Sequence, residues 1–189
     1  MKQIVYDEYH AFLKKRTLLG KVYRKFWLYP TLCKFLSGRT LDIGPGIGDF
    51  IRFRPNTIGV DINPDNVEYC RAQGLDVRLI EINRLPFEDG EIDSINMDNV
   101  LEHIEDPSLI LSEMTRVLKK GGIALIGVPG VLGFKTAPDH EIYYSKEHLE
   151  ETFVNLGYKV QKIFSMPIEC SWLDSRIEQY CYYGVFKKG

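Results

Sequence analysis

Short apolar runs alternate with amphipathic segments along most of this chain of 189 residues. This alternation restricts the fold more than any other feature, because strands separated by helices form a parallel sheet through right-handed crossovers. The run at 123–128 (IALIGV) is apolar throughout, as expected for a strand that is buried on both faces of such a sheet. The pattern predicts an α/β, doubly wound fold with helices on both faces.

Capping residues divide the chain into elements. Asn63 and Pro64 suit the N-cap and first position of a helix, and Gly74 suits its end. Two final strands are expected to form an antiparallel pair at one edge of the sheet. The expected strands span 39–43, 57–61, 76–81, 92–97, 123–128, 158–164 and 180–186, and the expected helices span 7–36 with a break near Pro30, 64–74, 107–120 and 145–157.

Composition excludes several classes of protein. The formal net charge of −2 gives no basic footprint for a nucleic acid. No run approaches the roughly 20 apolar residues of a membrane span, so we expect a cytoplasmic protein without one. The four cysteines form no C-x-x-C pair and no histidine lies at zinc spacing beside them, so the sequence predicts free thiols and no metal. One domain over 1–189 is expected from the length.

A glycine-rich loop follows the first expected strand. It reads Asp42-Ile43-Gly44-Pro45-Gly46-Ile47-Gly48, with glycine at alternate positions. Glycines here allow positive φ angles and a close approach of the backbone to a ligand. The third glycine comes one residue earlier than in the dinucleotide fingerprint G-x-G-x-x-G, and Asp49 follows it. Acidic groups around a helix start repel a diphosphate, so the loop favours a ligand with a positive end.

Asp61 ends the second expected strand. A carboxylate at this position can accept hydrogen bonds from both hydroxyl groups of an unphosphorylated ribose. The unit of strand, glycine loop, helix, strand and acid therefore predicts a nucleoside ligand. A structural turn with a solvent-facing Asp61 is the alternative interpretation.

Four segments, in this order and spacing, carry a family resemblance: LDIGPGIGDF, GVDINPD, EINRLPFEDGEID and LKKGGIALIGVP. Over roughly residues 39–164 the chain resembles class I S-adenosylmethionine-dependent methyltransferases, and within them the small-molecule type related to the ubiquinone and menaquinone biosynthesis enzymes. The resemblance implies a Rossmann-like, seven-stranded, mostly parallel sheet with an antiparallel edge strand. It also implies a helical lid at 1–37 over a core at 38–189, and S-adenosylmethionine as cofactor.

The resemblance also implies roles for the cofactor-binding residues. The loop of Gly44, Gly46 and Gly48 would pass under the methionine part, with Asp42 orienting its ammonium group. Asp61 would hold the ribose hydroxyls, and Ile62 would pack on the adenine. Glu81, Ile82 and Asn83 stand where the family has an acid that accepts from the adenine amino group, with glutamate in place of aspartate. Asp98 and Asn99 would lie beside the methionine end; a helix-capping role for Asp98 is the alternative.

Catalysis by this type of enzyme requires no particular base, because the methyl donor is already activated. His140, in a loop expected over the pocket mouth, is the first candidate to contact the acceptor, and His103 is the second; imidazole is the usual base near neutral pH. Both could instead be structural. Tyr143, Tyr144 and His10 are candidate substrate contacts, although packing under the loop is the favoured role for the two tyrosines.

The sequence thus predicts methyl transfer to a small-molecule acceptor, by O- or N-methylation, in a monomer or homodimer. One alternative is a nicotinamide-dependent oxidoreductase, which shares the glycine loop and the acid but predicts the absent G-x-G-x-x-G. The other is a non-catalytic module that binds S-adenosylmethionine or a partner.

Overall fold

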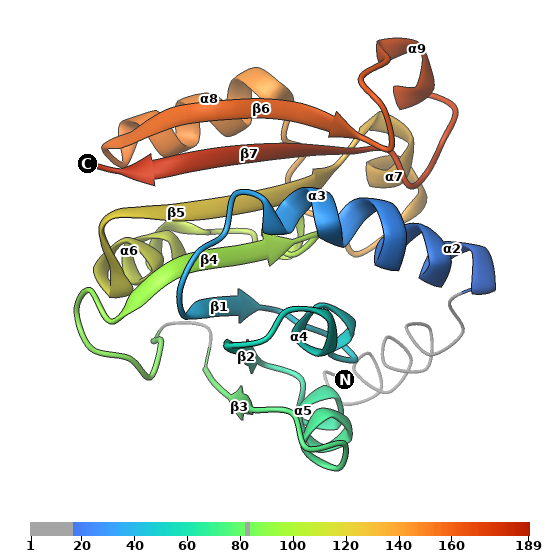
Figure 1. The fold of residues 1–189 in the computed structure, drawn as a ribbon. Coiled ribbons are helices and arrows are strands. Elements are labelled where there is room, and N and C mark those ends of the chain that lie inside the picture. Colours follow the sequence, from blue (N-terminus) through green and yellow to red (C-terminus); the bar gives the residue numbers. More distant parts are fainter. Residues whose placement is uncertain (1–16, 82–83) are drawn as a thin grey trace.

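Seven strands form one sheet in the part of the chain that the computed structural model describes, residues 17–81 and 84–189 (Figure 1). Their order is β3-β2-β1-β4-β5-β7-β6. Strand β7 runs antiparallel to both β5 and β6, whereas β1 to β5 pair in parallel. The mostly parallel, doubly wound sheet with an antiparallel pair at one edge is confirmed. The strands are β1 (Thr40–Ile43), β2 (Thr57–Asp61), β3 (Val77–Leu79), β4 (Ile92–Asp98), β5 (Leu118–Pro129), β6 (Tyr158–Met166) and β7 (Cys181–Lys188).

Helices cover both faces of the sheet (Figure 1). Apolar residues of α6 and α8 pack on one face, and those of α3 and α4 pack on the other. None of the helices in the described residues is both long and apolar enough to cross a membrane. The helical elements are α2 (Leu18–Tyr23), the π-helical turn η1 (Arg24–Leu28), α3 (Tyr29–Cys33), α4 (Asp49–Phe53), α5 (Pro64–Arg71), the 3₁₀ turn η2 (Leu101–His103), α6 (Ser108–Val117), α7 (Val131–Thr136), α8 (Lys146–Asn155) and α9 (Ser171–Asp174).

The sheet is buried on both faces, as its apolar strands predict. Met97 and Ile126 lie in the core under α6 and α8, and Leu125 and Tyr183 lie in the core under α3. Phe153 of α8 stacks on Phe186 with ring centroids 4.3 Å apart. Burial on this scale holds the carboxyl ends of the strands at fixed positions.

The expected break near Pro30 takes the form of the π-helical turn η1, after which α3 begins at Tyr29 and continues to Cys33. Proline lacks an N–H group and its ring clashes with the carbonyl four residues earlier in an α-helix. Here the preceding turn is π-helical, and the N–H group of Tyr29 donates to the carbonyl of Arg24, five residues back. The wider turn accommodates the proline, and the helix packs along the sheet face with its α2 end beyond the carboxyl ends of the strands (Figure 1).

Several element boundaries also differ from expectation. Strand β3 is shorter than the expected 76–81. Helix α6 ends at Val117, so Lys119 and Lys120 belong to β5 rather than to the helix. Strand pairing overrides the helical pattern there, because Leu118 pairs with Ile92 and its carbonyl accepts from Nζ of Lys188 at 2.7 Å.

Candidate active site

The chain turns sharply after β1 through three glycines with positive φ. Their φ angles are 70° at Gly44, 55° at Gly46 and 78° at Gly48. A Cβ atom on Gly44 would lie 2.5 Å from Cγ2 of Val100, and one on Gly48 would lie 2.5 Å from Cδ1 of Leu75. Backbone strain and lack of space both require glycine, so the loop presents bare backbone at the carboxyl end of the sheet.

Asp42 lies in β1 just before this loop, with only 3% of its surface exposed. Its Oδ1 atom accepts from Nδ2 of Asn96 at 2.6 Å. Its Oδ2 atom is buried and has no hydrogen-bond partner among the described residues. Burial raises the pKa of this carboxyl to about 8. An ammonium group bound at the loop would supply the missing partner, so the residue fits the cationic end of S-adenosylmethionine.

Asp61 ends β2 and is also buried, but both of its oxygens have partners. Oδ1 accepts from the backbone N–H of Asn63 at 2.8 Å, and Oδ2 accepts from Nδ2 of Asn66 at 3.1 Å. Burial raises its pKa, although these bonds oppose the shift. Each carboxylate oxygen can accept more than one hydrogen bond, so the oriented group can still receive ribose hydroxyls. Asp61 is not solvent-facing, so that part of the structural-turn alternative is wrong.

The adenine-side residues are placed in part. Ile62 follows β2 with 41% of its surface exposed, which leaves an apolar face for a ring to pack on. Glu81 is exposed. The expected contacts at Ile82 and Asn83 lie outside the described residues.

Asp98 at the end of β4 caps none of the helices in the described residues. Its Oδ1 atom accepts from the hydroxyl of Tyr183 at 2.8 Å and from Nδ2 of Asn99 at 2.9 Å. Its Oδ2 atom lies 3.8 Å from Nη1 of Arg24. The network joins η1, β4 and β7, and neither Tyr183 nor Arg24 carries a local sequence signal that could have predicted it.

The two candidate catalytic histidines lie together. The rings of His103 and His140 meet edge to face with centroids 4.7 Å apart. Nδ1 of His103 lies 3.1 Å from Oδ2 of Asp139, and Nδ1 of His140 lies 3.0 Å from the carbonyl of Phe134. Burial, with a contribution from His103, lowers the pKa of His140, which favours the neutral imidazole.

Glu102 stands beside them, and sequence reasoning missed it. Its side chain is fully buried and neither oxygen has a hydrogen-bond partner among the described residues; Nε2 of His140 is 3.9 Å from Oε1. Burial raises its pKa to about 8. Its neighbour His103 was the available signal, but burial could not be read from the sequence.

The remaining candidates for substrate contact differ in accessibility. Tyr144 is buried in the core and stacks on His148 with centroids 4.8 Å apart, which is a packing position. Tyr143 is half-buried against Phe134. His10 lies outside the described residues.

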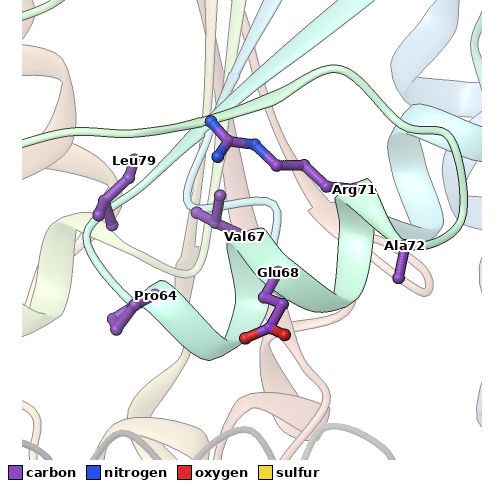
Figure 2. Close-up of a pocket in the computed structure, with 6 residues that line it drawn as sticks. All are labelled: Pro64, Val67, Glu68, Arg71, Ala72 and Leu79. Carbon is purple, nitrogen blue, oxygen red and sulfur yellow. The ribbon is translucent and has the colours of Figure 1, made fainter.

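A surface hollow of about 420 Å³ lies between α5 and β3 (Figure 2). None of its lining residues is a predicted site residue. Figure 2 shows them to be Pro64, Val67, Glu68, Arg71, Ala72 and Leu79.

Comparisons with known proteins agree with the cofactor that is expected at the glycine loop. Residues 41–126 match the family described as a methyltransferase domain. Over 78% of its length the chain is 28% identical to a Mycolicibacterium smegmatis protein named "probable S-adenosylmethionine-dependent methyltransferase", of which it covers 65%. It is 30% identical, over 46% of its length, to the ubiquinone/menaquinone biosynthesis C-methyltransferase of Desulfotalea psychrophila, of which it covers 39%. The chain thus spans less than two thirds of the length of these curated relatives.

The fold is shared more widely. An S-adenosylmethionine-dependent methyltransferase from Archaeoglobus fulgidus superimposes with a TM-score of 0.74 at 21% identity, over 97% of this chain and 99% of that one. The same fold is indicated by the glycine loop, by the order of the strands and by these matches. Residues 41–126 are therefore similar to a methyltransferase domain, and the chain resembles proteins named S-adenosylmethionine-dependent methyltransferases.

Proposed function

We propose that this protein binds S-adenosylmethionine along the carboxyl ends of β1, β2 and β4 and transfers its methyl group to a small-molecule acceptor by O- or N-methylation. The observation that carries the proposal is the buried Oδ2 atom of Asp42, which has no hydrogen-bond partner among the described residues and adjoins a loop of three glycines with positive φ. A buried carboxylate oxygen of this kind requires a donor, and the cofactor's ammonium group is one.

Each binding residue has a part in this proposal. The loop has no side chains at Gly44, Gly46 and Gly48, so its backbone leaves room for the methionine moiety. Asp42 orients the ammonium group of that moiety. Asp61 receives the ribose hydroxyls, while Ile62 covers one face of the adenine. Glu81, Ile82 and Asn83 contribute the adenine edge contacts, and Asp98 and Asn99 border the methionine end.

The chemistry asks little of the protein beyond positioning. S-adenosylmethionine supplies a methyl group that is already activated by its sulfonium. The protein must align the acceptor with the methyl carbon and exclude water, and alignment alone contributes on the order of 7–11 kcal/mol. In this proposal His103 lies after β4, His140 and Tyr143 lie after β5, and all three would contact the acceptor. The helices before β1 would act as the lid at 1–37.

The two alternatives make different predictions. A nicotinamide-dependent oxidoreductase binds a diphosphate, which the carboxylate of Asp49 in the first turn of α4 disfavours. A non-catalytic module would bind S-adenosylmethionine without turnover.

Calorimetric titration with S-adenosylmethionine, S-adenosylhomocysteine and NADH tests the proposal. We expect saturable binding of the first two and none of NADH. Turnover of methyl-labelled donor with a pool of metabolites then separates an enzyme from a binding module. NADH binding, or no binding of either adenosyl compound, would contradict the proposal.

A further inference from the structure

We propose that Glu102, His103 and His140 form a binding site for a divalent first-row transition metal ion such as Zn²⁺ or Mn²⁺. Each of the three residues offers one ligand atom, and these atoms all lie within 4.8 Å of one another. Two imidazoles and one carboxylate are the protein ligands of many catalytic zinc sites and of non-haem iron sites. Small side-chain rotations would bring such atoms to the ligand distances of about 2.0–2.2 Å that these metals need.

The buried carboxyl group of Glu102 is the strongest observation for a ligand. Nearly all buried polar atoms in proteins have a hydrogen-bond partner, so a carboxyl group with two unpartnered oxygens needs an explanation. Its side chain is 1% exposed, which leaves it little access to water. A cation held between the glutamate and the two histidines would satisfy it.

The contacts around the two histidines prepare them for this role. Histidines that bind metals nearly always donate their second ring N–H to a carboxylate or a backbone carbonyl, which fixes the tautomer. Nδ1 of His103 contacts the side chain and carbonyl of Asp139 at 3.1 and 3.2 Å, and Nδ1 of His140 contacts the carbonyl of Phe134 at 3.0 Å. Both rings are thereby oriented to use Nε2 as the ligand atom.

Backbone hydrogen bonds hold the two halves of the cluster together. The carbonyl of Glu102 accepts from the N–H groups of Glu141 and Ile142 at 2.7 and 3.1 Å. The turn η2, which carries Glu102 and His103, is therefore tied to the loop that carries His140.

The cluster also adjoins the glycine loop. Val100, two residues before Glu102, occupies the space beside Gly44 that a Cβ atom would need. Three protein ligands leave coordination positions open for water or for an oxygen atom of the acceptor. This role beside the acceptor rests on the proposed function, whereas metal binding itself does not. The lack of zinc-like spacing in the sequence led to the opposite expectation, because His140 is distant from Glu102 along the chain.

Metal titration of the tag-free, chelator-treated full chain tests the site directly. We expect calorimetry with ZnCl₂ to give one ion per chain, and CoCl₂ to give a visible spectrum of nitrogen and oxygen ligation. Glu102→Gln and His140→Ala should each weaken binding at least about 100-fold, because even changes in outer contacts of metal ligands cost about 10–100-fold. His148→Ala, which removes an exposed histidine, is the matched control and should bind like the wild type.

The inference is overturned if the wild-type chain binds no metal, or if both Glu102→Gln and His140→Ala bind as tightly as His148→Ala. A thiolate charge-transfer band with cobalt would also overturn it, because the ligand would then be a cysteine. Circular dichroism identifies a variant that does not fold, and the wild-type titration and spectrum decide without it. Titration of the same proteins with S-adenosylmethionine reports separately on the proposed function.

Discussion

Two buried carboxyl groups at the same edge of the sheet, Asp61 and Glu102, differ in what surrounds them. Asp61 receives hydrogen bonds from Asn63 and Asn66, which follow it directly along the chain. Glu102 receives none from any other described residue, and the imidazole of His140, whose Nε2 atom lies 3.9 Å from Oε1, comes from a loop after the next strand. The first group is oriented by its own segment, and the second is placed by packing alone.

The difference indicates what each group can bind. A carboxylate that already accepts hydrogen bonds from two donors does not need a cation as its partner. It can accept further hydrogen bonds from neutral hydroxyl groups, so Asp61 suits a ribose. A carboxyl group without donors is costly to bury as an anion and gains most from a cation, so Glu102 suits a metal ion. Asp42 lies between these cases, with one oxygen bonded and the other unpartnered.

The largest expected effect is the loss of cofactor affinity when the side chain of Asp61 is removed. Asp61→Ala should weaken S-adenosylmethionine binding by at least about 100-fold, because hydrogen bonds to a charged group contribute roughly 1.5–3 kcal/mol each. Calorimetry measures this, with Asp76→Ala, an exposed aspartate before β3, as the control. Equal affinity of Asp61→Ala and the wild type would show that the nucleoside lies elsewhere.

Unfolding measurements at several pH values test whether the Asp42 carboxyl is buried with a raised pKa. The folded carboxyl holds its proton up to about pH 8, whereas the ordinary value is 3.8. The folded state therefore binds more protons between these values, and the free energy of unfolding falls as the pH rises, by up to about 1.4 kcal/mol per unit. Urea denaturation at pH 5, 6, 7 and 8 should show a flatter dependence for Asp42→Asn. Parallel curves for the two proteins would contradict a buried, unpartnered Asp42.

A pair of glycine substitutions tests the contact between the glycine loop and Val100, which lies two residues before Glu102. Gly44→Ala should destabilise the protein by about 1–2 kcal/mol through its positive φ and by roughly a further 1–3 kcal/mol through the clash with Val100. Gly74→Ala is the matched control, because its φ is 75° and nothing lies within 4 Å of an added Cβ. Thermal and urea denaturation compare them, and Val100→Ala should relieve only the Gly44→Ala variant. Equal losses of stability at both glycines would contradict a close contact between an added Cβ at Gly44 and Val100.

The smallest effect on cofactor affinity is expected at His140. His140→Ala should change the S-adenosylmethionine Kd by less than about 2-fold, because the residue belongs to the acceptor side. The same variant should slow methyl transfer to any acceptor that turns over. Calorimetry and labelled-donor turnover measure the two quantities, and a large loss of cofactor affinity would place His140 in the cofactor site instead.

Local patterns in the sequence predicted most of the sheet and the Asp61 side. Strand β2 was expected at its observed bounds, and the N-cap at Asn63 accepts from Asp65 and Asn66 as its position predicts. These features arise from interactions between residues that are close along the chain, such as capping, glycine conformation and apolar periodicity. Such interactions have the same form in every protein, so the sequence alone determines them.

Tertiary structure alone decided the rest. Strand β7 lies between β5 and β6, which brings the hydroxyl of Tyr183 to Asp98 and closes a network with Arg24. The loop after β5 folds back on η2 and places His140 beside Glu102. Burial and pairing between distant segments depend on how every crossover packs at once, and no short stretch of sequence contains that information. The sequence therefore determined the sheet and its glycine loop, whereas packing decided which carboxyl groups remained without a partner.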